Sequence, residues 1–175
     1  MEKKVAILAV NPVNGYGLFQ YLESFFENGI PYKVFAVSDG KDIKTNSGIR
    51  MQADDTVENL KGHADEYAAL VFSCGDAVPV FQQNAHKPFN GDLLEVIREF
   101  AGRDKLMIGH CAAALMFEIA GVSGGKKLAV HPLAKPAIKN GIASDDLKAE
   151  DGNFYTAQSE HALSLLIPRL LEVLK

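Results

Sequence analysis

Two cysteines are the residues of this chain whose types and positions point most directly to chemistry. Cys111 lies in the segment Gly109-His110-Cys111-Ala112-Ala113, which has the form G-x-C-x-A. This form is similar to the nucleophile elbow G-x-S-x-G, in which a sharp turn between a strand and a helix presents the attacking side chain. The pattern therefore makes Cys111 the candidate nucleophile.

An elbow of this kind places physical demands on its neighbours. The strand and the helix approach each other closely, so the flanking side chains must be small, and Gly109, Ala112, Ala113 and Ala114 are small. The dipole of the helix favours a thiolate at its N-terminus, and the backbone N–H of Ala112 would face an oxyanion formed there. The alternative is that Cys111 is a buried core residue, a common fate of cysteine.

The elements that must position this residue follow from the hydrophobic pattern. Continuous apolar runs predict strands that are buried on both faces, and amphipathic stretches predict helices. Strands are expected at residues 5–10, 32–37, 68–73 and 105–109, helices at 18–28, 92–101 and 160–174, and a hairpin at 148–157. The alternation predicts a single α/β domain over residues 1–175, with a mostly parallel sheet covered on both faces.

The predicted sheet brings a second segment into the argument. In an open parallel sheet, ligands bind beyond the carboxyl ends of the strands. Ser73-Cys74-Gly75 follows the third predicted strand, and the elbow follows the fourth. Both cysteines are therefore expected at the same edge of the sheet.

The composition argues against a nucleic-acid-binding protein and against a membrane-spanning protein. The chain has 175 residues, a formal net charge of −4, and no basic excess of the kind that nucleic-acid binding requires. No run approaches the roughly 18 apolar residues of a membrane span, and the short apolar run at the N-terminus lacks a signal-peptide cleavage pattern. We expect a cytoplasmic protein with no nucleic-acid or membrane partner, whose cysteines are thiols at rest. No spacing indicates a metal site, and no cofactor is implied.

Four stretches carry a resemblance to a known family. They are MIGHCAAALMFEIAG at 107–121, GGKKLAVHPLAK at 124–135, ALVFSCG at 69–75 and DGNFYTAQS at 151–159. The chain resembles the ThiJ/PfpI superfamily, which has a class I glutamine amidotransferase-like fold and includes a deglycase branch and an intracellular protease branch. The resemblance implies a flavodoxin-like three-layer sandwich and an assembly of two or more copies, with a dimer expected.

The resemblance also implies roles for individual residues. Cys111 corresponds to the elbow cysteine of the family. The N–H groups of Gly75 and Ala112 would hold an oxyanion, and His131 corresponds to a histidine of the deglycase branch, a candidate base. The protease branch carries its histidine directly after the cysteine, where this chain has Ala112, so the protease triad is not reproduced.

Three departures from the family pattern have consequences. A glutamate of the loop after the first strand is replaced by Gly17, which predicts a less acidic Cys111 or one that is tuned by another group. Cys74 replaces a glycine, either as a small apolar residue or as a resolving thiol for a reversible disulfide with Cys111. The segment 156–161 lacks the arginine and glycines of the pattern.

Three functions remain open from the sequence. In the first, Cys111 attacks an electrophilic carbon of a small molecule or peptide, in a hydrolase, glyoxalase or deglycase reaction. In the second, the protein is a redox-sensing or ligand-binding module that uses Cys111 and Cys74. In the third, the fold serves as a dimerising scaffold with a decayed site.

Overall fold

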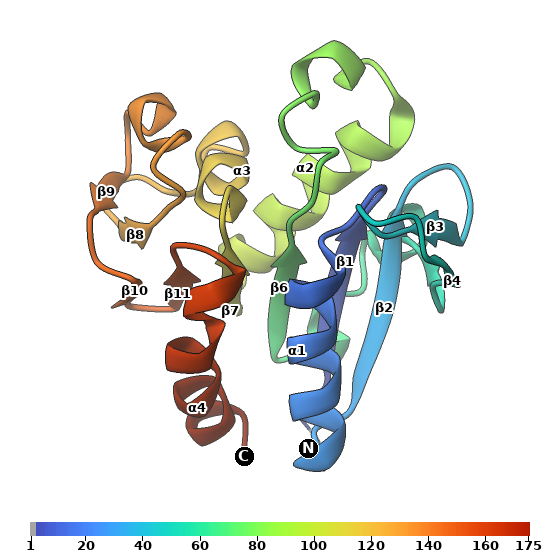
Figure 1. Ribbon diagram of the computed structural model, residues 1–175, viewed down its shortest axis with the longest axis horizontal. Coiled ribbons are helices and arrows are strands. Elements are labelled where there is room, and N and C mark those ends of the chain that lie inside the picture. Colours follow the sequence, from blue (N-terminus) through green and yellow to red (C-terminus); the bar gives the residue numbers. More distant parts are fainter. Residues whose placement is uncertain (1–2) are drawn as a thin grey trace.

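A seven-stranded, mostly parallel sheet forms the centre of the molecule in a computed structural model that describes residues 3–175 (Figure 1). The strands occur in the order β10-β11-β7-β6-β1-β2-β5, and only β10 pairs in antiparallel fashion. Their bounds are β1 Val5–Val10, β2 Tyr32–Val37, β5 Asp55–Thr56, β6 Ala69–Ser73, β7 Leu106–His110, β10 Lys148–Asp151 and β11 Phe154–Ala157. The predicted α/β fold with a flavodoxin-like parallel sheet is confirmed.

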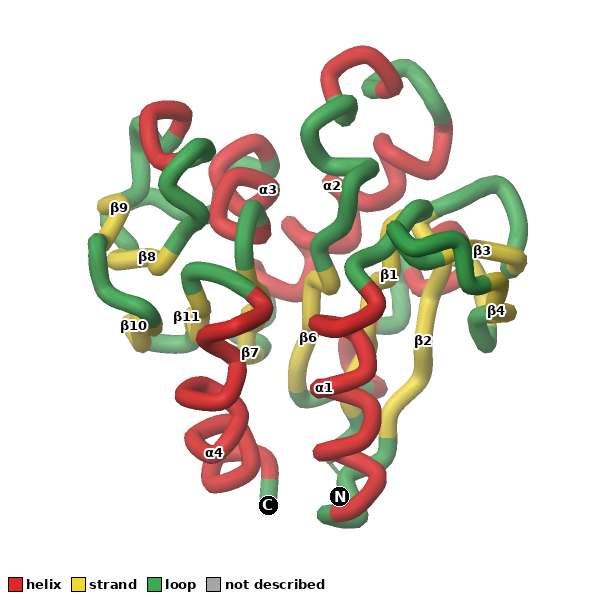
Figure 2. Tube along the Cα trace, in the orientation of Figure 1, coloured by secondary structure: helices red, strands yellow, loops and turns green. Residues whose placement is uncertain are grey.

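Helices cover both faces of this sheet, as the continuous apolar strands require. Every residue of β1 and β6 is buried, because each strand has neighbours on both sides and helices above and below. Helices α1 Gly15–Glu27 and α4 Leu163–Leu174 contact each other on one face, and α2 Pro88–Gly102 and α3 Ala113–Ile119 contact each other on the opposite face. Figure 2 shows the resulting three layers. No helix in the described range is both long and apolar enough to cross a membrane.

Several boundaries differ from the predicted ones. Helix α1 begins at Gly15 because the side chain of Asn14 caps it, accepting the N–H of Gly17 at 2.6 Å. The last predicted helix is divided into a 3-10 turn, Glu160–Ala162, and α4. A short helix expected from Thr56 to Leu60 is present as the 3-10 turn Val57–Leu60. The prediction missed β3 Asp42–Lys44, β4 Arg50–Gln52, β5, β8 Lys127–Ala129 and β9 Ile142–Ser144, and the 3-10 turns Ala64–Glu66, Gln82–Asn84 and Lys135–Ala137.

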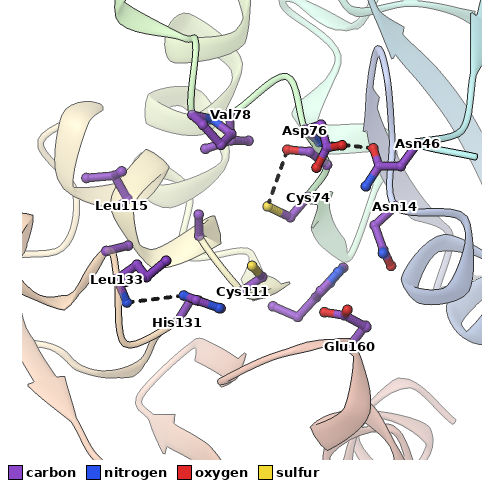
Figure 3. A pocket seen from close by; sticks show the side chains of 15 residues that line it. Asn14, Asn46, Cys74, Asp76, Val78, Cys111, Leu115, His131, Leu133 and Glu160 are labelled. Carbon is purple, nitrogen blue, oxygen red and sulfur yellow. Dashed lines mark hydrogen bonds between the residues drawn. The ribbon is translucent and has the colours of Figure 1, made fainter.

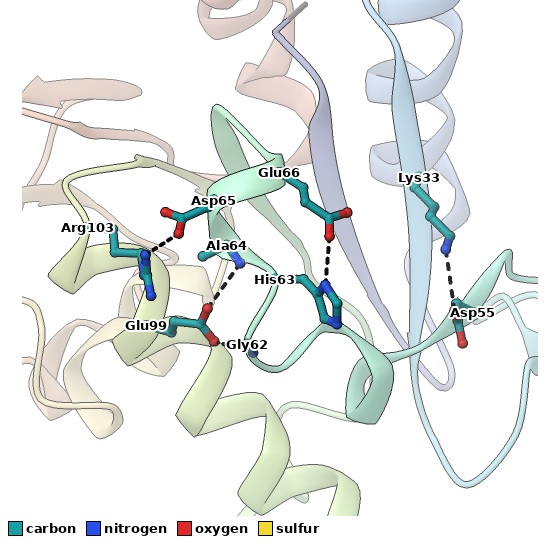
Figure 4. Close-up of polar contacts among 9 residues, drawn as sticks. All are labelled: Lys33, Asp55, Gly62, His63, Ala64, Asp65, Glu66, Glu99 and Arg103. Atoms are coloured by element: carbon teal, nitrogen blue, oxygen red, sulfur yellow. Dashed lines mark hydrogen bonds and ion pairs between the residues drawn. The ribbon is translucent and has the colours of Figure 1, made fainter. Parts of the chain in front are cut away.

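Polar contacts fix the loop that enters β6 (Figure 4). Both carboxylate oxygens of Glu99, on α2, accept backbone N–H groups, from Gly62 at 2.8 Å and from Ala64 at 3.0 Å. Arg103, at the end of α2, forms an ion pair with Asp65 of the same loop. The amino end of β6 is thereby attached to α2. The candidate site lies at the opposite, carboxyl ends of the strands.

Candidate functional site

A cavity of about 410 Å³ opens at the carboxyl ends of β6 and β7, and it brings the predicted site residues together (Figure 3). Cys111, Ala112, Cys74, Gly75 and His131 all line it. The other lining residues are Asn14, Asn46, Asp76, Val78, Pro79, His110, Leu115, Leu133, Ala134 and Glu160. Parallel strands deliver their ends to one edge of the sheet, so segments far apart in the sequence meet here.

Cys111 has the backbone geometry of an elbow. Its φ angle is +59°, in the left-handed region that few residues other than glycine adopt. Its N–H donates to Ala157 O at 3.1 Å, and its C=O accepts the N–H of His131 at 3.0 Å. These two hydrogen bonds hold the strained residue between β11 and the segment that follows β8.

The small neighbours of Cys111 are required by close approach, as predicted. A Cβ atom added at Gly109 would lie 2.3 Å from the Cβ of Ala113, so even alanine at this position collides with the helix. Gly75 is equally constrained, because a Cβ there would lie 2.2 Å from Pro12 O. Glycine at 75 therefore lets the loop after β1 pack against the loop after β6, where Asn14 N–H donates to Cys74 O at 2.9 Å.

The Cys74 thiol is the main tuning group of Cys111. The two sulfur atoms face each other across the cavity, with Cys74 buried and Cys111 partly exposed (Figure 3). A hydrogen bond from the Cys74 thiol lowers the pKa of Cys111, and the N–H of Ala112 lowers it further, while burial and the carboxylate of Glu160 raise it. The same hydrogen bond, with burial, raises the pKa of Cys74 well above its usual value. Of the two cysteines, Cys111 is therefore the one that loses its proton at the lower pH.

The backbone N–H groups expected to face an oxyanion both point at sulfur. The N–H of Ala112 donates toward Cys111 and toward Cys74, whereas the N–H of Gly75 donates toward Cys74. Helix α3 has only seven residues, so its dipole contributes less than the sequence pattern suggested. Ala112 is the donor closest to the reacting position.

His131 is oriented by its own loop. Its N–H binds Cys111 O, and its ring nitrogen Nδ1 accepts the N–H of Leu133 at 3.1 Å. An imidazole that accepts at Nδ1 carries its proton at Nε2 when it is neutral. In this conformation His131 offers a proton to the cavity, and acting as a base there requires release of the Leu133 contact.

His110 occupies the space that an acid at position 17 would need. A Cβ atom at Gly17 would lie 2.5 Å from His110 Nε2. The ring packs on α1, where Nδ1 lies 3.1 Å from the hydroxyl of Tyr21, and burial lowers the pKa of His110 to about 4. His110 is therefore neutral near pH 7, and its Nε2 has no hydrogen-bond partner among residues 3–175. The missing glutamate is explained by a buried histidine that fills its position.

Glu160 is the site residue that the sequence reasoning missed. It lies in the segment noted only for lacking an arginine, directly after β11, and its side chain is 26% exposed. Gln20 of α1 donates to Glu160 O at 3.0 Å, and Ser159 Oγ accepts the N–H of His161, which fixes the turn. Together with Asp76, Glu160 supplies the cavity with acids from the loop after β6 and from the C-terminal segment, instead of from the loop after β1.

Within the described range, no three side chains of the His, Cys, Asp or Glu types are grouped so as to hold a metal ion.

Comparisons with known proteins identify a family and relatives for this chain. The profile of the DJ-1/PfpI family matches residues 3–173. Protein ppBat of Bacteroides thetaiotaomicron is 66% identical over 175 residues, which are 100% of both chains. The uncharacterized protein MJ0967 of Methanocaldococcus jannaschii is 27% identical, over 99% of this chain and 81% of its own.

Solved structures of related proteins have the same fold. The crystal structure of the putative protease I from Bacteroides thetaiotaomicron superposes with a TM-score of 0.98 at 66% identity, covering 99% of each chain. Drosophila melanogaster DJ-1beta superposes with a TM-score of 0.84 at 21% identity, covering 99% of this chain and 91% of its own. The second likeness concerns the fold alone.

A double-mutant cycle tests whether His110 excludes a side chain at position 17. Gly17→Ala is expected to lower the free energy of unfolding by about 1–3 kcal/mol, because the buried ring cannot move away. In a His110→Ala background the same change should cost at least about 1 kcal/mol less, because only the side-chain oxygen of Asn14, 2.8 Å from the added Cβ, still has to move and alanine favours a helix over glycine. Urea denaturation measures both.

Gly91→Ala is the matched control for this cycle. Gly91 is exposed within α2, and a Cβ there would meet nothing within 4 Å. Gly91→Ala should raise the free energy of unfolding by the same amount in the wild-type and His110→Ala backgrounds. If Gly17→Ala costs the same with and without His110, the clash lies elsewhere.

The role of Cys74 as hydrogen-bond donor predicts a pH profile. The lowered pKa of Cys111 means that its thiolate forms at a lower pH than in a free cysteine. Cys74→Ala removes the donor, so the alkylation midpoint should move to higher pH. At pH 7 alkylation of Cys111 by iodoacetamide should then slow about fivefold, the equivalent of a hydrogen bond of roughly 1 kcal/mol.

Cys74→Ser keeps a donor of similar size and should retain most of the reactivity. Peptide mapping reports Cys111 separately in every variant. Equal profiles for wild type and Cys74→Ala would refute the donor role.

Proposed function

The chain belongs to the DJ-1/PfpI family, and on that premise we propose that it is a cysteine-dependent enzyme in which Cys111 attacks an electrophilic carbon. The carrying observation is a partly exposed cysteine with a lowered pKa, held at a positive φ angle in a cavity of about 410 Å³. A cavity of that size suits a small molecule or the end of a peptide. Hydrolase, glyoxalase and deglycase reactions all fit this proposal.

These reactions share one first step. The Cys111 thiolate forms a bond to the carbonyl carbon, and the electron pair of the C=O bond moves onto oxygen. The N–H of Ala112 and the Nε2–H of His131 stabilise the oxyanion by hydrogen bonds, and a proton from water neutralises it. With an aldehyde the product is a thiohemiacetal. With an amide the intermediate collapses and expels the amine, which takes up a proton from water. Water then hydrolyses the thioester to the carboxylic acid and the free Cys111 thiol.

Cys74 supports this step by solvating the thiolate. Its thiol lowers the pKa of Cys111, and its own raised pKa keeps the proton on Cys74. A neutral donor stabilises a thiolate less than a cation would, so the thiolate keeps its nucleophilicity. This arrangement takes the place of the carboxyl that the family pattern puts at position 17.

Turnover assays with matched variants test the proposal. We expect the protein to consume methylglyoxal or to hydrolyse short peptide amides, measured by loss of the aldehyde and by amine release. Cys111→Ala should abolish the activity, and His131→Ala should lower kcat by about 100-fold, as loss of one hydrogen-bond donor to the oxyanion does. His63→Ala, at the opposite end of β6, serves as the control and should be unchanged. Turnover that survives in Cys111→Ala would refute the proposal.

The facing sulfur atoms support a second candidate, a redox-sensing module. Attack of the Cys111 thiolate on hydrogen peroxide gives a sulfenic acid and releases hydroxide. Attack of the Cys74 thiol on the sulfenic sulfur then forms the disulfide and releases water. The position of Cys74 in the same cavity favours this route.

Peptide mapping after peroxide treatment separates the two candidates. The redox module predicts a Cys74–Cys111 disulfide within the monomer, reversed by dithiothreitol. In Cys74→Ser, Cys111 should instead proceed to the sulfinic acid. If wild type also yields only the sulfinic acid, Cys74 is not a resolving thiol.

A further inference from the structure

The cavity around Cys111 has an uneven distribution of charge. Two charged side chains line it, Glu160 and Asp76, and both are acidic. Neither lysine nor arginine lines it within residues 3–175. We propose that the cavity selects small electrophiles that carry a positively charged amine beside an apolar group, and that it disfavours carboxylated or phosphorylated ones. This inference rests on the proposed role of Cys111 as nucleophile.

The two carboxylates lie on one side of the sulfur atoms. In Figure 3, Asp76, Asn46, Asn14 and Glu160 lie on the side opposite Leu115 and Leu133. Asn46 Oδ1 accepts the N–H of Asp76 at 3.1 Å, which ties the two loops that carry them. Amide and carboxylate oxygens are acceptors for an ammonium group, so this side matches a cationic amine.

The opposite side of the cavity is apolar and suits an apolar group of a ligand. Val78, Leu115, Leu133 and Ala134 line it, and Leu133 is 87% exposed. An exposed leucine at the edge of a cavity is suited to cover an apolar group of a ligand. A ligand that spans the cavity therefore meets an apolar surface, the Cys111 sulfur, and then two carboxylates.

The negative charges of the two carboxylates act on the sulfur atom of Cys111. Both Glu160 and Asp76 act to raise the pKa of Cys111, which means that they oppose its thiolate. An ammonium group bound between them would cancel this opposition. A cationic substrate would thus promote formation of the thiolate that attacks it, whereas an anionic one would add a further negative charge.

The two histidines that line the cavity do not offset its negative charge. Burial keeps His110 neutral, and its Nε2 is a buried polar atom without a partner in the cavity wall. His131 uses Nδ1 to accept the N–H of Leu133, the arrangement of a neutral ring. Neither ring therefore adds charge to the cavity, and the Nε2 of His110 faces Gly17 on α1.

Methanethiosulfonate reagents of different charge test the proposal. In each, the thiolate attacks the sulfenyl sulfur, forms a mixed disulfide and displaces methanesulfinate. The probes are the neutral methyl, the cationic 2-ammonioethyl and the anionic 2-sulfonatoethyl reagent. Second-order rates at Cys111, located by peptide mapping, are compared with those of 2-mercaptoethanol at the same pH and ionic strength.

The expected result is a cationic-to-anionic rate ratio about tenfold or more above that of 2-mercaptoethanol, because local charges act strongly at short range in a cavity. Glu160→Gln should reduce this excess at least threefold, and raised salt should reduce it further. Glu27→Gln removes the same charge from the exposed end of α1, away from the cavity, and should leave the ratio unchanged. Cys74→Ser repeats the measurement with one thiol.

The neutral reagent separates the two proposals. If it fails to modify Cys111, the nucleophile itself is refuted. If it reacts readily while the charge ratio equals that of 2-mercaptoethanol or favours the anionic reagent, charge selection is refuted and the nucleophile stands.

Discussion

The left-handed backbone of Cys111 is the constraint on which the site depends. A non-glycine residue at φ +59° is held there because its N–H and C=O are both bonded, to Ala157 and His131. Those two partners belong to segments that also carry Glu160 and the imidazole of the cavity. The strain is therefore stabilised by the same hydrogen bonds that assemble the walls around the sulfur.

Close packing around the elbow explains why the chemistry is distributed as it is. Gly109 and Gly75 allow close contacts, with Ala113 and with the backbone of Pro12, that any side chain at these positions would prevent. Gly17 leaves room for the ring of His110. With that ring in place, no carboxyl can stand next to Cys111 from the loop after β1. The thiolate is stabilised instead by the Cys74 thiol, and the acids of the cavity come from the loop after β6, through Asp76, and from the turn after β11, through Glu160.

Much of the fold could be predicted because the signals are local. Continuous apolar runs such as residues 5–10 and 69–73 identify strands, and the small residues beside Cys111 identify the elbow. The edge elements β3, β4, β8 and β9 were missed because three-residue strands carry too little pattern. The start of α1 was placed late because an asparagine cap, not an apolar residue, sets it.

The parallel sheet, the elbow and the two cysteines at one sheet edge could be inferred from the sequence alone, since apolar runs and small residues are local features. Only the tertiary structure decided what surrounds the sulfur. The occupation of the space at position 17 by His110, the hydrogen bond from Cys74 and the arrival of Glu160 all join segments distant in the chain. Such contacts depend on packing across elements, and no periodicity or spacing within one segment records them.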